Sequence, residues 1–392
     1  MSSARPSTPP VRDRADACPG ALQTHSAADG ELARVRVPGG LLRADQLRTL
    51  GAAAVELGDG ALELTSRGNV QLRGLRPGAA GELGERLAAA GLLPSDTHET
   101  ARNLLSSVLS GRAGGLLDAR PWVRAFDAGL CADPSLAALP GRFLATFDDG
   151  RGDVAALGGD VGLLALSRDM VSLTLAGADS GLRATPEDAV ALALAATRAF
   201  LTERAEQGGR AWRLAELTDG PARVTVRVGG APGAARVDVP AEPRVRAIGA
   251  VPQDDGRTAL AAVAPLGRLT AAQLPVLADL AAEVQLTPWR GVVVPDLADG
   301  SAAAALLVEV GLVLDPGSPW TRVTACAGLP RCAKSLADVR ADVTAAVVVG
   351  ALPADGARQH WAGCERRCGR PGGAVVDVVA TASGYRVDAP TA

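Results

Sequence analysis

The chain reads Arg34-Val-Arg-Val-Pro-Gly-Gly-Leu-Leu-Arg-Ala-Asp-Gln-Leu-Arg-Thr-Leu50 and continues to Leu62-Glu-Leu-Thr-Ser-Arg-Gly-Asn-Val-Gln-Leu72. A second copy reads Ala261-Ala-Val-Ala-Pro-Leu-Gly-Arg-Leu-Thr-Ala-Ala-Gln-Leu-Pro-Val-Leu277 and continues to Val284-Gln-Leu-Thr-Pro-Trp-Arg-Gly-Val-Val-Val294. Each copy is an alternating apolar run, a Pro/Gly turn, an amphipathic run with helical spacing, and a further alternating run. The pattern predicts a β-turn-α-β module in two copies. Asp45 and Thr270 lie near the helix starts, where short polar residues serve as caps.

The two copies are expected to pair into one composite α+β layer. Chance similarity in a compositionally biased chain is the alternative, but the turns after Thr65 and Thr287 match at the same point of each copy. A fainter helical repeat relates residues 116–126 to 335–346, which predicts the order A-B-A′-B′. The expected units are a lead-in at 1–14, a first half-module at 15–80, an α/β segment at 81–243, a second half-module at 244–315 and a final segment at 316–392.

Composition excludes several classes of protein. Hydrophobic residues make up 47% of the chain, and 40 basic against 43 acidic residues give a net charge of −3, so no basic field favours nucleic acid. The stretch 1–10 is polar and lacks the apolar core of a secretory signal. The most apolar run, 303–314, is too short to span a bilayer. We therefore expect a soluble cytoplasmic protein.

Four cysteines lie in two close pairs near the C-terminus. Cys326 and Cys332 form C-x5-C, 31 residues follow, and Cys364 and Cys368 form C-x3-C. Thiolates are soft, anionic donors that suit iron and sulfide, so the pattern favours an iron–sulfur cluster. Basic neighbours would offset the negative charge of such a cluster, and these are Arg331, Lys334, Arg366, Arg367 and Arg370.

Other interpretations of the cysteines are weaker. Structural zinc usually uses tighter C-x2-4-C knuckles, and a disulfide framework is typical of small secreted domains. Cysteines also serve as small buried hydrophobes, an interpretation that suits the isolated Cys18 and Cys131.

Together these features resemble the siroheme nitrite and sulfite reductase family, over nearly the whole chain from about Ala15. The resemblance implies an α+β fold in which duplicated ferredoxin-like half-domains pair into one domain, with two α/β catalytic segments. It implies that the four cysteines ligate a [4Fe–4S] cluster. In the reductases the last of the four cysteines also bridges to the siroheme iron, and the corresponding residue here is Cys368.

The same resemblance suggests three anion-binding arginines. Arg67 lies in Thr65-Ser-Arg-Gly-Asn-Val-Gln71, Arg102 in an Arg-Asn turn, and Arg142 in Leu139-Pro-Gly-Arg-Phe-Leu144. In the reductases the last loop presents two lysines to sulfite or nitrite. Here the corresponding residues are Arg142 and Leu144, and leucine has no charge with which to stabilise an oxyanion.

One sub-branch, the precorrin-3B synthases, resembles the chain further in its compact length, in Gly363-Cys-Glu-Arg-Arg-Cys-Gly-Arg-Pro371 and in the opening Asp16-Ala-Cys-Pro-Gly20. This resemblance implies O2-dependent hydroxylation of precorrin-3A at C20 with γ-lactone formation. It also implies a [4Fe–4S] cluster and a non-haem iron. Precorrin-3A is rich in carboxylates, which the planar fork of arginine binds well. Arg67, Arg102 and Arg142 are the candidate clamp, with Arg290 a further candidate.

Two other hypotheses stay open: a siroheme-dependent nitrite or sulfite reductase, and an electron-carrying iron–sulfur protein. No G-x-G-x-x-G fingerprint follows a convincing strand, so we expect reducing equivalents from a separate, NADH-linked donor. The chain has three histidines, His25, His98 and His360, and none is assigned as an iron ligand.

Overall fold

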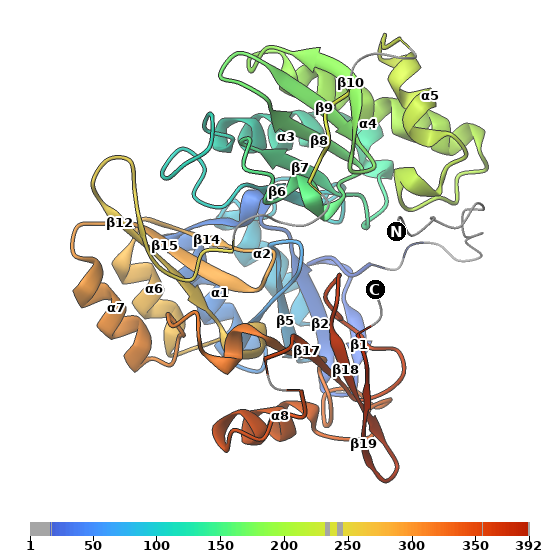
Figure 1. The fold of residues 1–392 in the computed structure, drawn as a ribbon. Coiled ribbons are helices and arrows are strands. Elements are labelled where there is room, and N and C mark those ends of the chain that lie inside the picture. The colour runs from blue at the N-terminus through green and yellow to red at the C-terminus, as the bar shows by residue number, and fades with distance from the viewer. Residues whose placement is uncertain (1–15, 17, 232–235, 241–245, 355, 391–392) are drawn as a thin grey trace.

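The computed structural model describes residues 16, 18–231, 236–240, 246–354 and 356–390. The lead-in predicted at 1–14 lies outside these residues. Within them the chain forms four sheets and eight α-helices. Figure 1 shows a double module in blue and orange, a green segment on one side of it, and a smaller red segment at its lower edge. The mixed arrangement confirms the predicted α+β class.

The double module contains two five-stranded antiparallel sheets that exchange one short strand each. The first sheet has the order β1 (His25–Ala27), β2 (Gly30–Val35), β5 (Val70–Leu75), β4 (Ala61–Leu64) and β13 (Arg268–Thr270). The second has the order β11 (Gly249–Pro252), β12 (Thr258–Val263), β15 (Gly291–Leu297), β14 (Glu283–Leu286) and β3 (Leu41–Arg43). Leu269 of the second copy lies opposite Leu62, and Leu42 of the first lies opposite Val284. Neither copy completes its sheet alone, which confirms that the two pair into one domain.

Four helices cover these sheets: α1 (Ala44–Leu57), α2 (Ala79–Ala89), α6 (Gln273–Leu280) and α7 (Gly300–Glu309). They share one hydrophobic core with both sheets, and α1 packs against α6. The first half-module therefore continues through α2 to Leu93.

The helix starts differ from the prediction, because neither Asp45 nor Thr270 caps its helix. Gln46 Oε1 accepts from the Arg43 N–H at 3.1 Å, and Gln273 Oε1 accepts from the Thr270 N–H at 2.8 Å. The longer glutamine side chain reaches back from inside the helix to an N–H that has no intrahelical partner.

The other two segments share one topology. The first runs β6 (Leu104–Ser106), α3 (Arg120–Ala132), β7 (Ala145–Asp148), β8 (Val161–Ala165), β9 (Val171–Leu175) and β10 (Ala178–Ala184), followed by α4 (Ala189–Glu206) and α5 (Gly220–Arg227). The second runs β16 (Val323–Ala325), α8 (Val339–Val348), β17 (Gln359–Ala362), β18 (Val376–Thr381) and β19 (Gly384–Asp388). In both, three parallel strands are followed by an antiparallel one. This agreement supports the order A-B-A′-B′.

Each Pro/Gly turn of the repeat docks on the segment that follows it. The 3-10 turn Pro38–Gly40 contacts β6 and α3, and its counterpart Pro265–Gly267 contacts β16. Gly39 has a φ of 67°, and a Cβ there would lie 3.4 Å from the Ser106 Cβ, so glycine suits both the backbone and the space. In the described ranges, none of the helices combines the length and apolar character needed to cross a membrane.

Candidate functional site

The first cysteine of each pair lies just after a strand of the final sheet. Cys326 follows β16 directly, and Cys364 follows β17 after a single glycine. The two strands are parallel, so their carboxyl ends meet at one edge of the sheet. The Cys326 N–H donates to the Trp361 carbonyl at 3.0 Å, and the Gly363 N–H donates to Cys326 Sγ at 3.2 Å. Residues 38 positions apart in the chain thus begin two neighbouring loops.

The loop that carries Cys332 is held against the first half-module. The Cys332 N–H donates to the Gly328 carbonyl, and Arg73 donates to the carbonyl of Arg331 at 3.0 Å. The Arg331 guanidinium lies 3.2 Å from Asp59, so it forms an ion pair there. This arginine therefore anchors the loop rather than lying free beside the thiols.

The loop that carries Cys368 is anchored in a similar way. Asp377 of β18 is buried, and it accepts hydrogen bonds from Arg367 at 3.1 Å and from Arg370 at 2.9 Å. The Asp377 carboxylate thus already balances part of the positive charge of Arg367 and Arg370, which the sequence predicts to offset the negative charge of a cluster.

Three of the four thiols, those of Cys326, Cys332 and Cys368, lie within electrostatic range, because the latter two act on the first. Burial raises the pKa of the Cys326 thiol, and the neighbouring thiols of Cys368 and Cys332 raise it further. Backbone N–H groups of Gly363 and Gly328 act in the opposite direction. All four cysteines are free, and N–H donors that face sulfur are typical of iron–sulfur sites. This donor set fits a [4Fe–4S] cluster held by the four cysteines, and the assignment stays a prediction.

Gly363 offers a test of this geometry. A Cβ at this position would lie 1.8 Å from Ser335 Oγ and 2.7 Å from the Ser335 Cβ, so Gly363→Ala must displace one of the two cysteine loops. We expect this variant to lose cluster iron and about 1–3 kcal/mol of unfolding free energy, as overpacked sites do. Iron and sulfide analysis with denaturant unfolding measures both effects.

The control is Gly372→Ala, because a Cβ at Gly372 would meet no atom within 4 Å. Equal iron content in Gly363→Ala, Gly372→Ala and the unaltered protein would contradict the close approach of the two loops.

Arg67 and Arg290 occupy equivalent turns of the two half-modules. Arg67 Nη1 donates to the Gly141 carbonyl at 3.4 Å, and Arg290 Nη2 donates to the Gly369 carbonyl at 2.7 Å. Each arginine therefore reaches a loop of the segment that follows its own half-module. Burial lowers the pKa of Arg67 to about 10, with Arg213 nearby as the next cause, and burial also lowers the pKa of Arg290. Neither side chain is a freely solvated surface arginine.

The loop of Arg142 carries a single cation. Arg142 is exposed, and its guanidinium carbon lies 5.2 Å from the centroid of the Trp212 ring. Leu144 is 4% exposed and packs with Leu105 and Val154 in a small core. The position that is charged in the resembling reductases is therefore apolar and turned into the protein here.

The contacts of Arg102 differ from those expected of a residue that binds substrate carboxylates. Its side chain is 4% exposed, it forms a two-pronged ion pair with Asp127 of α3 at 2.7 Å for both contacts, and its Nη1 donates to the Leu92 carbonyl at 2.9 Å. Its donors are occupied inside the protein. Substrate binding by Arg102 stays a prediction, and the geometry favours a structural role.

Two further arginines were missed by the sequence analysis. Arg34 lies in β2 and Arg36 directly follows that strand, and both side chains reach Cys18 Sγ. Electrostatic coupling places both beside Arg67, and Arg67 is also coupled to Arg142. We call Arg34, Arg36, Arg67 and Arg142 the arginine group. Charged residues that interrupt an apolar strand were the available signal.

The three histidines do not form one site in the described structure. His98 is buried and bonds Ser95 and the Asp133 carbonyl, and His25 is exposed on β1. His360 is buried in β17 beside Thr324, and burial with nearby Arg290 lowers its pKa to about 4. None of these positions supplies the two-histidine set that mononuclear iron commonly uses.

Three buried carboxylates do converge: Asp148 at the end of β7, and Asp149 and Asp153 in the loop after it. Asp148 accepts backbone N–H groups at 2.8–3.1 Å, Asp149 pairs with Arg151, and Asp153 accepts from Ser107. Burial and the charge of Asp148 raise the pKa of Asp153 to about 6. Each carboxylate has a partner in the protein, so we assign the group to the fold.

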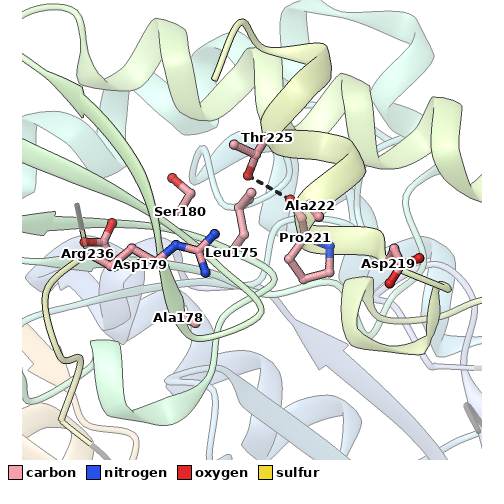
Figure 2. A pocket seen from close by; sticks show the side chains of 9 residues that line it. All are labelled: Leu175, Ala178, Asp179, Ser180, Asp219, Pro221, Ala222, Thr225 and Arg236. Carbon is pink, nitrogen blue, oxygen red and sulfur yellow. Dashed lines mark hydrogen bonds between the residues drawn. The ribbon is translucent and has the colours of Figure 1, made fainter. Parts of the chain in front are cut away.

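A cavity of about 240 Å³ lies between β10 and α5 (Figure 2). Two of the polar residues that line it already have partners: Asp179 is bonded to Arg183 and Ser172, and Thr225 bonds back to Pro221 in its own helix. Drug-sized ligands occupy pockets of about 300–1,000 Å³, and a tetrapyrrole is larger. None of the arginine group or the four cysteines lines this cavity.

Comparisons with known proteins agree with this architecture. The model of the nitrite/sulfite reductase ferredoxin-like half domain matches residues 25–90 and 251–306, the two copies of the repeat. A ferredoxin–nitrite reductase of Synechococcus elongatus is 28% identical over 87% of this chain and 74% of its own length. A precorrin-3B synthase of a Sinorhizobium species is 26% identical over 95% of this chain and 82% of its own. The solved structure of Mycobacterium tuberculosis NirA superposes with a TM-score of 0.68 at 21% identity, covering 87% of this chain and 69% of that one.

Proposed function

The chain belongs to the nitrite/sulfite reductase-like family, and on that premise we propose that it is an oxidoreductase acting on a carboxylate-rich tetrapyrrole. The proposed reaction is that of precorrin-3B synthase, the O2-dependent hydroxylation of precorrin-3A at C20 with closure of a ring-A acetate to a γ-lactone. One oxygen atom enters the macrocycle and the other leaves as water. A separate, NADH-linked donor supplies the two electrons.

The observation that carries this proposal is the burial of Leu144. Reduction of sulfite or nitrite needs cations around a small oxyanion in a desolvated site. Here the loop offers Arg142 alone, because Leu144 packs into a core. Arg67 and Arg142 suit the carboxylates of a larger substrate, since each guanidinium can make charge-assisted hydrogen bonds to them. A similarity to precorrin-3B synthase over 95% of the chain also supports the proposal.

The other parts of the proposed site have distinct roles. Cys326, Cys332, Cys364 and Cys368 would hold a [4Fe–4S] cluster, which supplies one-electron transfer when bound. Arg67 and Arg142 would hold the substrate carboxylates. The family also implies a non-haem iron, for which we assign no protein ligands.

A siroheme-dependent nitrite or sulfite reductase is the second candidate, favoured by the 28% identity to a ferredoxin–nitrite reductase. Anaerobically purified protein separates the two. We expect no siroheme absorption in the resting protein and, with precorrin-3A, reductant and isotopically labelled O2, one labelled oxygen atom in the product. Resting siroheme bands together with nitrite or sulfite consumption would favour the second candidate.

Arg67→Gln tests the proposed carboxylate contact. Loss of one charge-assisted hydrogen bond costs about 1.5–3 kcal/mol, so we expect the dissociation constant for precorrin-3A to rise at least tenfold. The cluster spectrum should stay unchanged, because Arg67 bonds the Gly141 carbonyl and, within the described structure, none of the four candidate cluster cysteines.

The matched control is Arg76→Gln, which removes an arginine of the same half-module whose partner is Glu82 on the exposed surface. Its dissociation constant should equal that of the unaltered protein. If Arg67→Gln also leaves the constant unchanged, Arg67 is not part of the substrate site.

A further inference from the structure

Cys18 lies in contact with the arginine group. Its Sγ accepts a hydrogen bond from Arg34 Nη1 at 2.9 Å and a longer one from Arg36 Nη2 at 3.5 Å. The sequence interpretation of Cys18 as a small buried hydrophobe is therefore wrong, because two guanidinium donors face its sulfur. Such donors favour a sulfur that carries negative charge.

Among the described residues, the arginines around Cys18 bond backbone carbonyls rather than carboxylates. The other side-chain hydrogen bonds of Arg36 go to the backbone carbonyls of Thr100 and Pro19, and that of Arg67 goes to Gly141. Arg36 is 3% exposed, and its Nη1 has no hydrogen-bond partner among the described residues. Burial lowers the pKa of Arg36 to about 10, whereas the Cys18 sulfur acts to raise it. A buried cation of this kind needs an anion nearby.

The position of Cys18 is set by the Arg142 loop. The Arg142 N–H donates to Asp16 Oδ2 at 3.0 Å, and the Cys18 N–H donates to the other oxygen of that carboxylate at 3.2 Å. A Cβ at Gly141 would lie 2.8 Å from the Cys18 Cβ, so the two segments are in close contact. The sign of the surrounding charge also excludes a metal cation here, since several guanidinium groups would repel it.

We propose that Cys18 is an arginine-bound thiolate that fills an anion site formed by Arg34 and Arg36. The chain itself thus supplies the anion, and a free oxyanion enters when the thiolate is removed. This inference goes beyond the proposed function, because it holds for the protein without any tetrapyrrole. It also gives a physical reason why this site would discriminate against small oxyanions, since a small oxyanion must displace the Cys18 side chain that is already in place.

Alkylation of the cluster-loaded protein tests the thiolate. With iodoacetamide at pH 6.5, the Cys18 sulfur forms an S–C bond and iodide leaves with its electron pair. Peptide mass spectrometry follows each cysteine separately, with half-buried Cys131 of α3 as the internal reference. We expect Cys18 to react at least tenfold faster than Cys131, and Arg34→Gln to remove most of this difference. Equal rates at the two cysteines, or a Cys18 rate unaffected by Arg34→Gln, would overturn the proposal.

Binding of inorganic phosphate tests independently whether Cys18 fills the anion site. By calorimetry, Cys18→Ala should bind phosphate at least tenfold more tightly than the unaltered protein. Cys18→Ser, which keeps a neutral hydroxyl of similar size, should do the same and guards against a folding defect in the alanine variant. Equal phosphate affinity in all three proteins would show that Cys18 does not fill an anion site.

Discussion

Replacing Cys364 with alanine is expected to remove the cluster and with it nearly all activity. Cys364 follows β17 next to the loop of Cys326, and an iron–sulfur cubane held by three thiolates loses one iron ligand outright. We expect iron and sulfide contents to fall from about four per chain to near zero. Turnover of precorrin-3A should fall at least a hundredfold, because electrons no longer reach the substrate. Metal analysis, the visible spectrum and single-turnover assays measure these effects.

Cys131→Ala is the matched control, since half-buried Cys131 packs against the hydrophobic core of the segment that holds β6 to β10 and is remote in sequence from the four candidate ligands. It should keep iron, sulfide and turnover. A Cys364→Ala protein that retains a full complement of iron and sulfide would refute the ligand assignment, and with it both the oxygenase and the reductase hypotheses.

Replacing Arg102 with alanine is expected to destabilise the protein rather than to weaken substrate binding alone. The variant leaves the Asp127 carboxylate and the Leu92 carbonyl without their partner. Breaking a buried ion pair from one side costs about 3–5 kcal/mol. The loss should appear in denaturant unfolding, since Arg102 joins the segment after α2 to helix α3.

Arg43→Ala is the comparison, because the pair of Arg43 with Asp45 is exposed on both sides. Exposed pairs contribute about 0–1 kcal/mol, so this variant should unfold almost as the unaltered protein does. If Arg102→Ala keeps its full stability but binds precorrin-3A more weakly, the substrate role suggested by the Arg-Asn turn is correct and the structural interpretation fails.

The repeat made most of the fold predictable. Alternating and helical spacings are local properties, and they identified both half-modules and their order along the chain. They could not show that β3 and β13 cross to the other copy, because strand partners depend on which edges meet in space. The caps were also mistaken, since Gln46 and Gln273 reach back from within their helices to make the bonds expected of neighbouring residues.

The candidate site was predictable where chemistry follows spacing. Two close thiol pairs indicated a metal cluster, and the structure places Cys326 and Cys364 after adjacent parallel strands. The arginines were harder, because the role of a guanidinium depends on its partner. Arg102 finds a carboxylate and a carbonyl, whereas Arg36 finds a cysteine sulfur and backbone carbonyls.

The order of residues was sufficient to establish a duplicated α+β chain with four clustered cysteines, because periodicity and spacing are written along the backbone. It could not establish which charges are neutralised, which leucine lies inward, or that Cys18 meets Arg34 and Arg36. Those outcomes arise when segments distant in sequence pack together, because burial and charge pairing depend on distances through space.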